Sequence, residues 1–200
     1  MKKILFSALP LAILAMISLH PASDPLPIGA ALPNPDVKMK DVSGKEVSFK
    51  EATKKNGLLV MFSCNTCPYV VKNQSRTKEA CSYAQKNDIG VVVLNSNEGN
   101  RSDEDSYNAM KEYASHQKYD WYYLVDKNAV MADAFGAKRT PECYLFDKNG
   151  KLVYHGAIDD NPSDPGAVNR KHLISAMDEM KAGKDVSVKE SRSVGCGIKK

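Results

Sequence analysis

The sequence predicts a single α/β domain in which a central mixed sheet is flanked by helices. Residues 58–62 and 89–94 are continuous apolar runs, which are typical of strands buried on both faces of a sheet. Segments with helical character follow these strands, as the crossover connections of parallel strands require. Residues 147–150, Asp-Lys-Asn-Gly, lie between two further β-type segments and are typical of a hairpin turn. The hairpin adds antiparallel strands, so we expect a mixed sheet.

Turn residues and apolar runs define the elements expected in the first half of the domain. Ser43-Gly44-Lys45 lies between two short β-type segments, which predicts a hairpin. Pro68 suits the first turn of a helix, where its missing N–H is tolerated. The polar stretch 95–105 predicts a long loop. The elements expected here are strands over 37–39 and 46–49, a strand over 58–62, a helix over 68–87 and a strand over 89–94.

Helical periodicity and glycine define the elements of the second half. Tyr107, Met110 and Tyr113 fall on one face of a helix. Gly136 and Gly183 are placed to end two others. The elements expected here are a helix over 106–118, a strand over 122–125, a helix over 128–135, strands over 143–146 and 151–155, and a helix over 168–181.

Composition excludes several classes of protein. The chain has 200 residues, of which 42% are hydrophobic and 26% are charged, as is ordinary for a globular domain. This excludes a disordered chain, a collagen and a multi-pass membrane protein. The formal net charge is only +4, and no basic cluster with interleaved aromatic residues is present. We therefore expect no nucleic-acid partner.

The N-terminal segment predicts export. Lys2 and Lys3 precede the uncharged stretch 4–19, which is typical of a secretory signal peptide over residues 1–22. A retained N-terminal membrane anchor is the alternative, although a span needs about 20 apolar residues. The domain is expected over 26–183, followed by a polar tail over 184–200. Export implies a periplasmic or other extracytoplasmic compartment, in which disulfides persist, and we expect a monomer there.

The motif Cys64-Asn65-Thr66-Cys67-Pro68 lies where the strand over 58–62 gives way to a helix. The N-terminus of a helix favours a thiolate and lowers the pKa of a cysteine. Cys64 is expected at the exposed turn as the nucleophile, and Cys67, one helical turn on, is placed to form a disulfide with it. A structural zinc site normally needs a second ligand pair, which the four histidines do not supply. Reversible thiol chemistry is therefore predicted, with a static disulfide as an alternative.

Two segments of the chain resemble the active-site segments of the thioredoxin-like superfamily. They are residues 62–70, FSCNTCPYV, and residues 139–150, RTPECYLFDKNG. The closest resemblance is to the redoxin branch, which includes peroxiredoxin-like proteins and exported thiol–disulfide oxidoreductases. It covers roughly residues 26–183 and implies a thioredoxin-like fold that needs no cofactor. It also implies protein thiols or disulfides as substrates and a thiol–disulfide redox partner.

The resemblance further implies roles for individual residues. Cys64 would be the attacking thiol and Cys67 the thiol that resolves the mixed disulfide. Pro141 would be a cis-proline beside the pair, and Thr140 would offer backbone groups to a substrate.

Departures from the family pattern bear on activity. A peroxiredoxin-like peroxidase is an alternative function, but Met61 stands where a peroxiredoxin has a threonine three residues before its reactive cysteine. The buried acid of the thioredoxin active-site strand is absent from residues 58–62. Glu142 is the nearby acidic residue, and we interpret it as a solvent-facing strand residue.

The remaining cysteines differ in what the sequence predicts for them. Cys81 is expected on a buried helix face. Cys143 follows Pro141 by two residues on a strand and so shares its face, which makes it a possible additional redox thiol or a packed core residue. Cys196 lies between two glycines in a tail expected to be mobile, and we hypothesise that it forms a disulfide with an active-site cysteine or with Cys143. A copper-handling module is a further alternative, because two thiolates and Cys196 are soft ligands suited to copper(I); no metal site is otherwise predicted.

Overall fold

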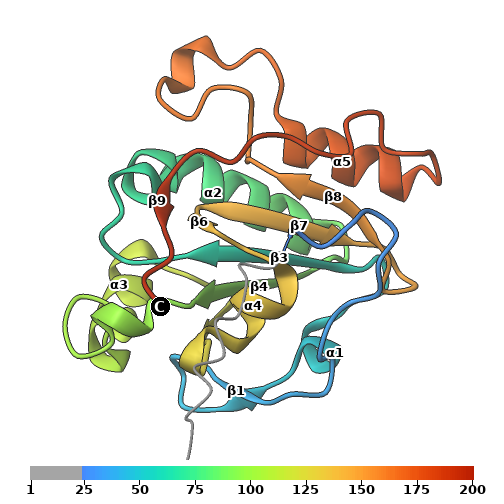
Figure 1. Ribbon diagram of the computed structural model, residues 1–200. Helices are drawn as coiled ribbons and strands as arrows, with labels where there is room; N and C mark the ends of the chain where they lie inside the picture. The colour runs from blue at the N-terminus through green and yellow to red at the C-terminus, as the bar shows by residue number, and fades with distance from the viewer. Residues whose placement is uncertain (1–23) are drawn as a thin grey trace, which may run out of the picture.

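The computed structural model describes residues 24–200 of the chain (Figure 1). The predicted signal peptide over 1–22 lies outside the described residues. Within residues 24–200, every helix is too short or too polar to cross a membrane.

A five-stranded mixed sheet forms the centre of the molecule, in the order β5-β4-β3-β7-β8. β3, β4 and β5 run parallel, whereas β7 is antiparallel to β3 and β8 is antiparallel to β7. All residues of β3, β4 and β7 are buried, which explains why the sequence shows apolar runs without alternation. The strands are β3 (Leu58–Ser63), β4 (Gly90–Asn95), β5 (Tyr122–Val125), β7 (Glu142–Phe146) and β8 (Leu152–Gly156). The predicted mixed α/β sheet is confirmed.

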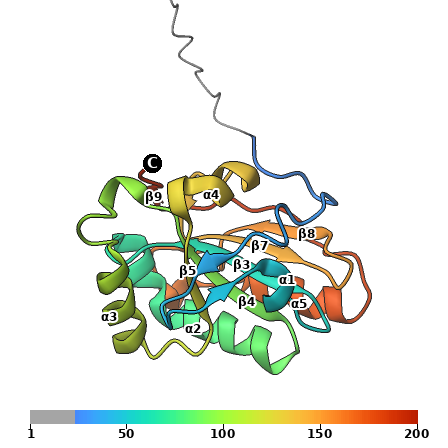
Figure 2. The ribbon, with the colours of Figure 1, turned by 90° about the horizontal axis from the view of Figure 1, so that it is seen from below.

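Helices cover both faces of the sheet (Figure 2). α2, α3 and α5 pack on one face, with Leu59 and Met61 of β3. α1, α4 and the β1–β2 hairpin pack on the other, with Val60 and Phe62, because successive strand residues point to opposite faces. The helices are α1 (Phe49–Ala52), α2 (Pro68–Lys86), α3 (Tyr107–Gln117), α4 (Val130–Phe135) and α5 (His172–Lys181), with 3-10 turns at Glu98–Asn100, Lys127–Ala129 and Pro165–Ala167, and the hairpin strands are β1 (Met39–Lys40) and β2 (Glu46–Val47).

Three helices differ from the sequence prediction. The short helix α1 was not expected; Ser48 and Glu51 form a capping box that starts it. α4 begins at Val130 because Asn128 and Ala129 have left-handed backbone angles. α5 begins four residues later than expected, because Val168, which follows the 3-10 turn that Asp164 caps, has an extended backbone.

The polar tail is packed against the domain along its length. Its strand β9 (Cys196–Gly197) pairs antiparallel with β6 (Arg139–Thr140), the two-residue strand that precedes β7. Figure 1 shows β9 in red beside β6. Before β9, the N–H of Ser191 donates to the carbonyl of His155, and after it, the N–H of Ile198 donates to the carbonyl of Lys138. The tail therefore belongs to the folded unit, whereas we had expected it to be mobile.

Candidate active site

Cys64 and Cys67 lie at the junction of β3 and α2. β3 ends at Ser63, Cys64 begins the turn, and Cys67 is the N-cap residue of α2 with Pro68 in the first turn. Both cysteines are free thiols. This placement agrees with the strand, turn and helix that the sequence predicts around the motif.

Thr140 contacts both thiols from the neighbouring part of the sheet. Its hydroxyl oxygen Oγ1 lies 3.4 Å from Cys64 Sγ, and its carbonyl oxygen lies 3.3 Å from Cys67 Sγ. The Thr140–Pro141 peptide bond is cis, as the resemblance implied. The pairing of β3 with β7 places this peptide beside the thiols, since Phe62 is the register partner of Glu142.

Cys196 is a third thiol at the same place. It is the register partner of Thr140 in the β6–β9 pair, and it packs half-buried against Cys64, Cys67 and Val70. Its side chain and its backbone N–H both hydrogen-bond Cys67, and both bonds lower the pKa of Cys67. The structure thus brings together Cys64, Cys67, Cys196 and Thr140.

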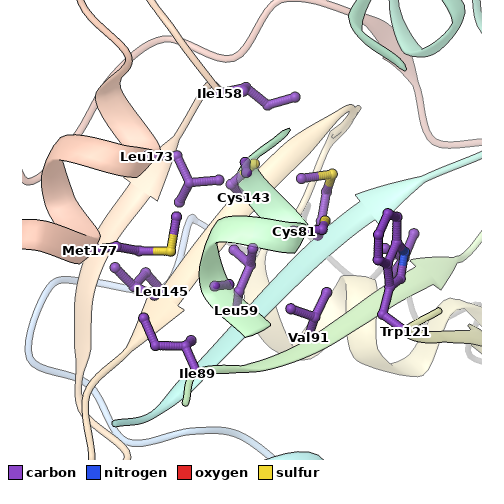
Figure 3. Packing of buried hydrophobic residues seen from close by; sticks show 14 of the residues in the cluster. Leu59, Cys81, Ile89, Val91, Trp121, Cys143, Leu145, Ile158, Leu173 and Met177 are labelled. Carbon is purple, nitrogen blue, oxygen red and sulfur yellow. The ribbon is translucent and has the colours of Figure 1, made fainter. Parts of the chain in front are cut away.

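Cys143 and Cys81 lie in the hydrophobic core beneath the site. Both side chains are fully buried among residues of β3, β7, α2 and α5 (Figure 3). Burial raises the pKa of each thiol, so both remain protonated. The prediction of a buried helix-face position is confirmed for Cys81, and Cys143 occupies the packed strand position that was the alternative to a redox role.

The predicted exposure of Cys64 is wrong. Only 2% of Cys64 and 4% of Cys67 is accessible to solvent. The turn after Cys64 is drawn inward because the side chain of Asn65 is buried, donating to the carbonyl of Glu104 and accepting from the hydroxyl of Tyr123. With the tail in place, the thiols are covered.

Hydrogen bonds shift the pKa values of Cys64 and Cys67 in opposite directions. The pKa of Cys67 is lowered to about 4, chiefly because Cys64 donates a hydrogen bond to it, with further bonds from Cys196 and the backbone N–H of Val70. The pKa of Cys64 is raised by the same bond and by burial. In this tail-docked arrangement the thiolate is favoured at Cys67, whereas the sequence placed the reactive thiolate at Cys64.

Asp105 is an acidic residue of the site that sequence reasoning missed. It is fully buried and accepts hydrogen bonds from the backbone N–H of Asn65 at 3.0 Å, from Asn95 Nδ2 at 2.6 Å and from Asn97 Nδ2 at 2.8 Å. The pKa of Cys64 is raised chiefly by its hydrogen bond to Cys67 and by burial, and the negative charge of Asp105 raises it further. The sequence signal was slight, since Asp105 stands in a polar loop with several other acidic residues.

Glu142 is buried, so its interpretation as a solvent-facing residue is wrong. Its carboxylate lies 2.7 Å from His155 Nε2 and accepts hydrogen bonds from the backbone N–H groups of Lys138 and Arg139. Although burial opposes the effect, these bonds lower the pKa of Glu142. The carboxylate therefore ties β6, which carries Thr140, to β8.

Cys64, Cys67 and Cys196 lie together, but among residues 24–200 no three His, Cys, Asp or Glu side chains have the arrangement of a metal site.

A comparison with protein families matches residues 28–170 to the Redoxin family. The chain belongs to the Redoxin family. It is a thiol redox protein with a thioredoxin-like fold, as its resemblance to the redoxin branch implied. No curated protein matches the chain.

Solved structures support the same fold over most of the chain. An uncharacterized conserved protein of Geobacillus kaustophilus is 31% identical, with a TM-score of 0.80 over 87% of this chain and 92% of that one. A hypothetical protein of Sinorhizobium meliloti is 30% identical, with a TM-score of 0.79 over 88% and 96%. A mutant PrxQ of Xylella fastidiosa shares the fold alone, at 13% identity and a TM-score of 0.59 over 80% and 99%. The fold shared with these structures thus extends over most of this chain.

Proposed function

We propose that this Redoxin-family protein is a thiol–disulfide oxidoreductase that exchanges disulfides with protein partners through Cys64 and Cys67. The observation that carries the proposal is the contact of both thiols with Thr140 beside a cis peptide, at the N-terminus of α2. Two thiols in this arrangement alternate between a dithiol and a disulfide without a metal or an organic cofactor.

The exchange proceeds in two balanced steps. Cys64 first passes its proton to the Cys67 thiolate that accepts its hydrogen bond. The Cys64 thiolate then attacks one sulfur of a substrate disulfide, which forms a mixed disulfide and releases one substrate thiolate, and this leaving thiolate takes the proton back from Cys67. Cys67 then attacks Cys64 Sγ, which forms the Cys64–Cys67 disulfide and releases the second substrate thiolate. The substrate gains two electrons and the pair loses two, and the reverse sequence oxidises a substrate dithiol. In the second step Cys67 still accepts hydrogen bonds from Cys196 and from the backbone N–H of Val70, and these favour its thiolate.

The edge of β6 suits an extended protein substrate. A substrate segment that adds to a sheet edge gains main-chain hydrogen bonds, and once β9 leaves this edge β6 offers the backbone groups of Arg139 and Thr140 directly beside the thiols. This supports a protein partner rather than a small disulfide, together with a second thiol–disulfide protein that restores the pair.

We infer that the protein is exported and acts as an extracytoplasmic monomer. Lys2, Lys3 and the uncharged stretch 4–19 support export, and an extracytoplasmic compartment allows the pair to be oxidised. N-terminal sequencing of the protein recovered from an extracytoplasmic fraction tests cleavage after the segment.

Acid quenching followed by alkylation tests the exchange reaction. With a disulfide-bonded protein substrate, Cys64→Ala should abolish exchange, and Cys67→Ser should accumulate mixed disulfides because the resolving thiol is absent. Cys81→Ala is the matched control, since it removes a core thiol outside the site. Undiminished exchange by Cys64→Ala would overturn the proposal.

Hydrogen peroxide separates this function from a peroxidase. We expect peroxide to oxidise Cys64 no faster than it oxidises free cysteine, because the threonine of the peroxiredoxin pattern is replaced by Met61. Peroxide consumption driven by a dithiol at a rate above that of free cysteine would assign a peroxidase instead.

A further inference from the structure

The tail of this chain occupies the sheet edge that a substrate segment would use. β9 pairs with β6 so that Cys196 is opposite Thr140 and Gly197 is opposite Arg139. The guanidinium of Arg139 also donates to the carbonyl of Gly195. The tail thus makes within one chain the antiparallel pairing by which an extended peptide adds to an edge strand.

Contacts on both sides hold this segment in register. Upstream, the hydroxyl of Ser191 accepts from the N–H of Ala157 at 2.9 Å and lies 2.7 Å from the hydroxyl of Tyr154. Downstream, the N–H of Lys199 donates to the side chain of Asn97 at 2.9 Å. Because Asn97 also donates to Asp105, the tail is connected to the network that holds the turn after Cys64.

Gly195 sets how closely the segment approaches the thiols. A Cβ at this position would lie 2.0 Å from the carbonyl oxygen of Thr140, whereas a Cβ at Gly197 would meet its nearest atom at 3.9 Å. The absence of a side chain at Gly195 therefore allows Cys196 to lie directly against Cys67.

We propose that Cys196 is a third redox thiol of the site, which exchanges with the Cys64–Cys67 disulfide. It acts in place of a substrate thiol, because β9 occupies the sheet edge that a substrate segment would use. The proposal rests on the exchange function proposed above. It selects Cys67 as the partner, because Cys196 hydrogen-bonds Cys67 and Cys143 is enclosed in the core.

The step is an internal exchange that needs no outside oxidant. The Cys196 thiolate attacks Cys67 Sγ of the Cys64–Cys67 disulfide, so the Cys67–Cys196 bond forms and the Cys64–Cys67 bond breaks. Cys64 leaves as a thiolate and takes up the proton that Cys196 lost. One disulfide replaces another, and no electron is gained or lost. The product is an oxidised protein in which Cys64 is again a thiol.

The hydrogen bonds agree with the direction of this step. In the reduced form the pKa of Cys196 is raised, because its thiol donates to Cys67. Once Cys67 is part of a disulfide it no longer carries a negative charge, and this cause of the raised pKa is removed. Oxidation of Cys64 and Cys67 thus lowers the pKa of Cys196 in the form of the protein that contains the disulfide it attacks.

Peptide mapping under non-reducing conditions tests the proposal. The full-length protein is oxidised in a glutathione disulfide buffer, quenched in acid, alkylated with N-ethylmaleimide and digested. We expect a Cys67–Cys196 peptide from a single chain, with Cys64 carrying the alkyl group. Cys196→Ser should abolish this peptide and leave only the Cys64–Cys67 disulfide.

A pair of glycine variants tests the role of the internal segment. Gly195→Ala should reduce the Cys67–Cys196 fraction about ten-fold, which corresponds to about 1.4 kcal/mol of lost docking. It should also speed alkylation of Cys64 in the reduced protein. Gly197→Ala, the matched control, should change neither readout.

The outcomes separate this proposal from the exchange function. A Cys64–Cys67 disulfide with quantitatively alkylated Cys196 would overturn the third-thiol proposal and leave the exchange function standing. Equal crosslinking in the two glycine variants would overturn the role of the docked segment. A chain in which neither Cys64 nor Cys67 forms any disulfide would overturn both.

Discussion

Replacing Asp105 by asparagine should destabilise the fold and loosen the turn between the two thiols. The Asp105 carboxylate accepts three hydrogen bonds, from the N–H of Asn65 and from the side chains of Asn95 and Asn97. In Asp105→Asn one acceptor oxygen becomes a donor, which leaves one of these donors unsatisfied at about 1 to 3 kcal/mol. The other two bonds lose their charge, at about 1 kcal/mol each. We therefore expect a loss of about 3 to 5 kcal/mol in the free energy of unfolding.

Urea unfolding followed by fluorescence measures this loss. The single tryptophan, Trp121, is buried in the core cluster and reports unfolding. Asp103→Asn is the matched control, because Asp103 is an exposed acid in the same loop and its replacement should change stability by less than about 0.5 kcal/mol. If Asp105→Asn unfolds at the same urea concentration as Asp103→Asn, the carboxylate does not hold the turn and the reasoning fails.

Three further predictions concern stability. The folded-state pKa of Glu142 lies below the ordinary 4.5, so its contribution is present above pH 4.5 and is lost as the pH falls below that value; Glu142→Gln should remove this part of the acid dependence in urea titrations, and an unchanged pH profile would contradict it. Asp159→Asn leaves Arg76, its buried ion-pair partner at 2.8 Å, without a counter-charge, and should cost about 3 to 5 kcal/mol; a loss below about 1 kcal/mol would show that the pair is dispensable. Gly57→Ala should cost about 1 to 3 kcal/mol, because φ is +120° and a Cβ would lie 2.1 Å from the carbonyl oxygen of Phe146; calorimetry showing an unchanged melting temperature would refute this.

The sequence predicted the elements whose signals are local. β3 and β4 are continuous apolar runs because both faces of these strands are covered by helices. The start of α2 followed from Pro68 and from the cysteine pair before it. The hairpin between β7 and β8 followed from its turn residues. These signals lie within a few residues of the structure that they specify.

The parts that were missed depend on contacts between distant segments. β6 and β9 are two residues each and form only because the tail returns to the cis peptide. Burial of Glu142 depends on His155 from the neighbouring strand, and burial of Asp105 depends on the turn at Asn65. The hydrophobic periodicity of one segment does not indicate which distant segment it will contact. The capping box of α1 was present in the sequence, but a four-residue helix gives no hydrophobic period to support it.

Enclosure of Cys81 and Cys143 affects the order in which this chain folds and is oxidised. An unfolded chain with five thiols can close several wrong rings. Once the core has formed, the two enclosed thiols are protonated and out of reach, and only the sulfurs at the N-terminus of α2 and in β9 remain available for exchange. We therefore expect a chain that is oxidised before its core forms to give scrambled disulfide isomers, whereas a chain oxidised afterwards can pair only Cys64, Cys67 and Cys196.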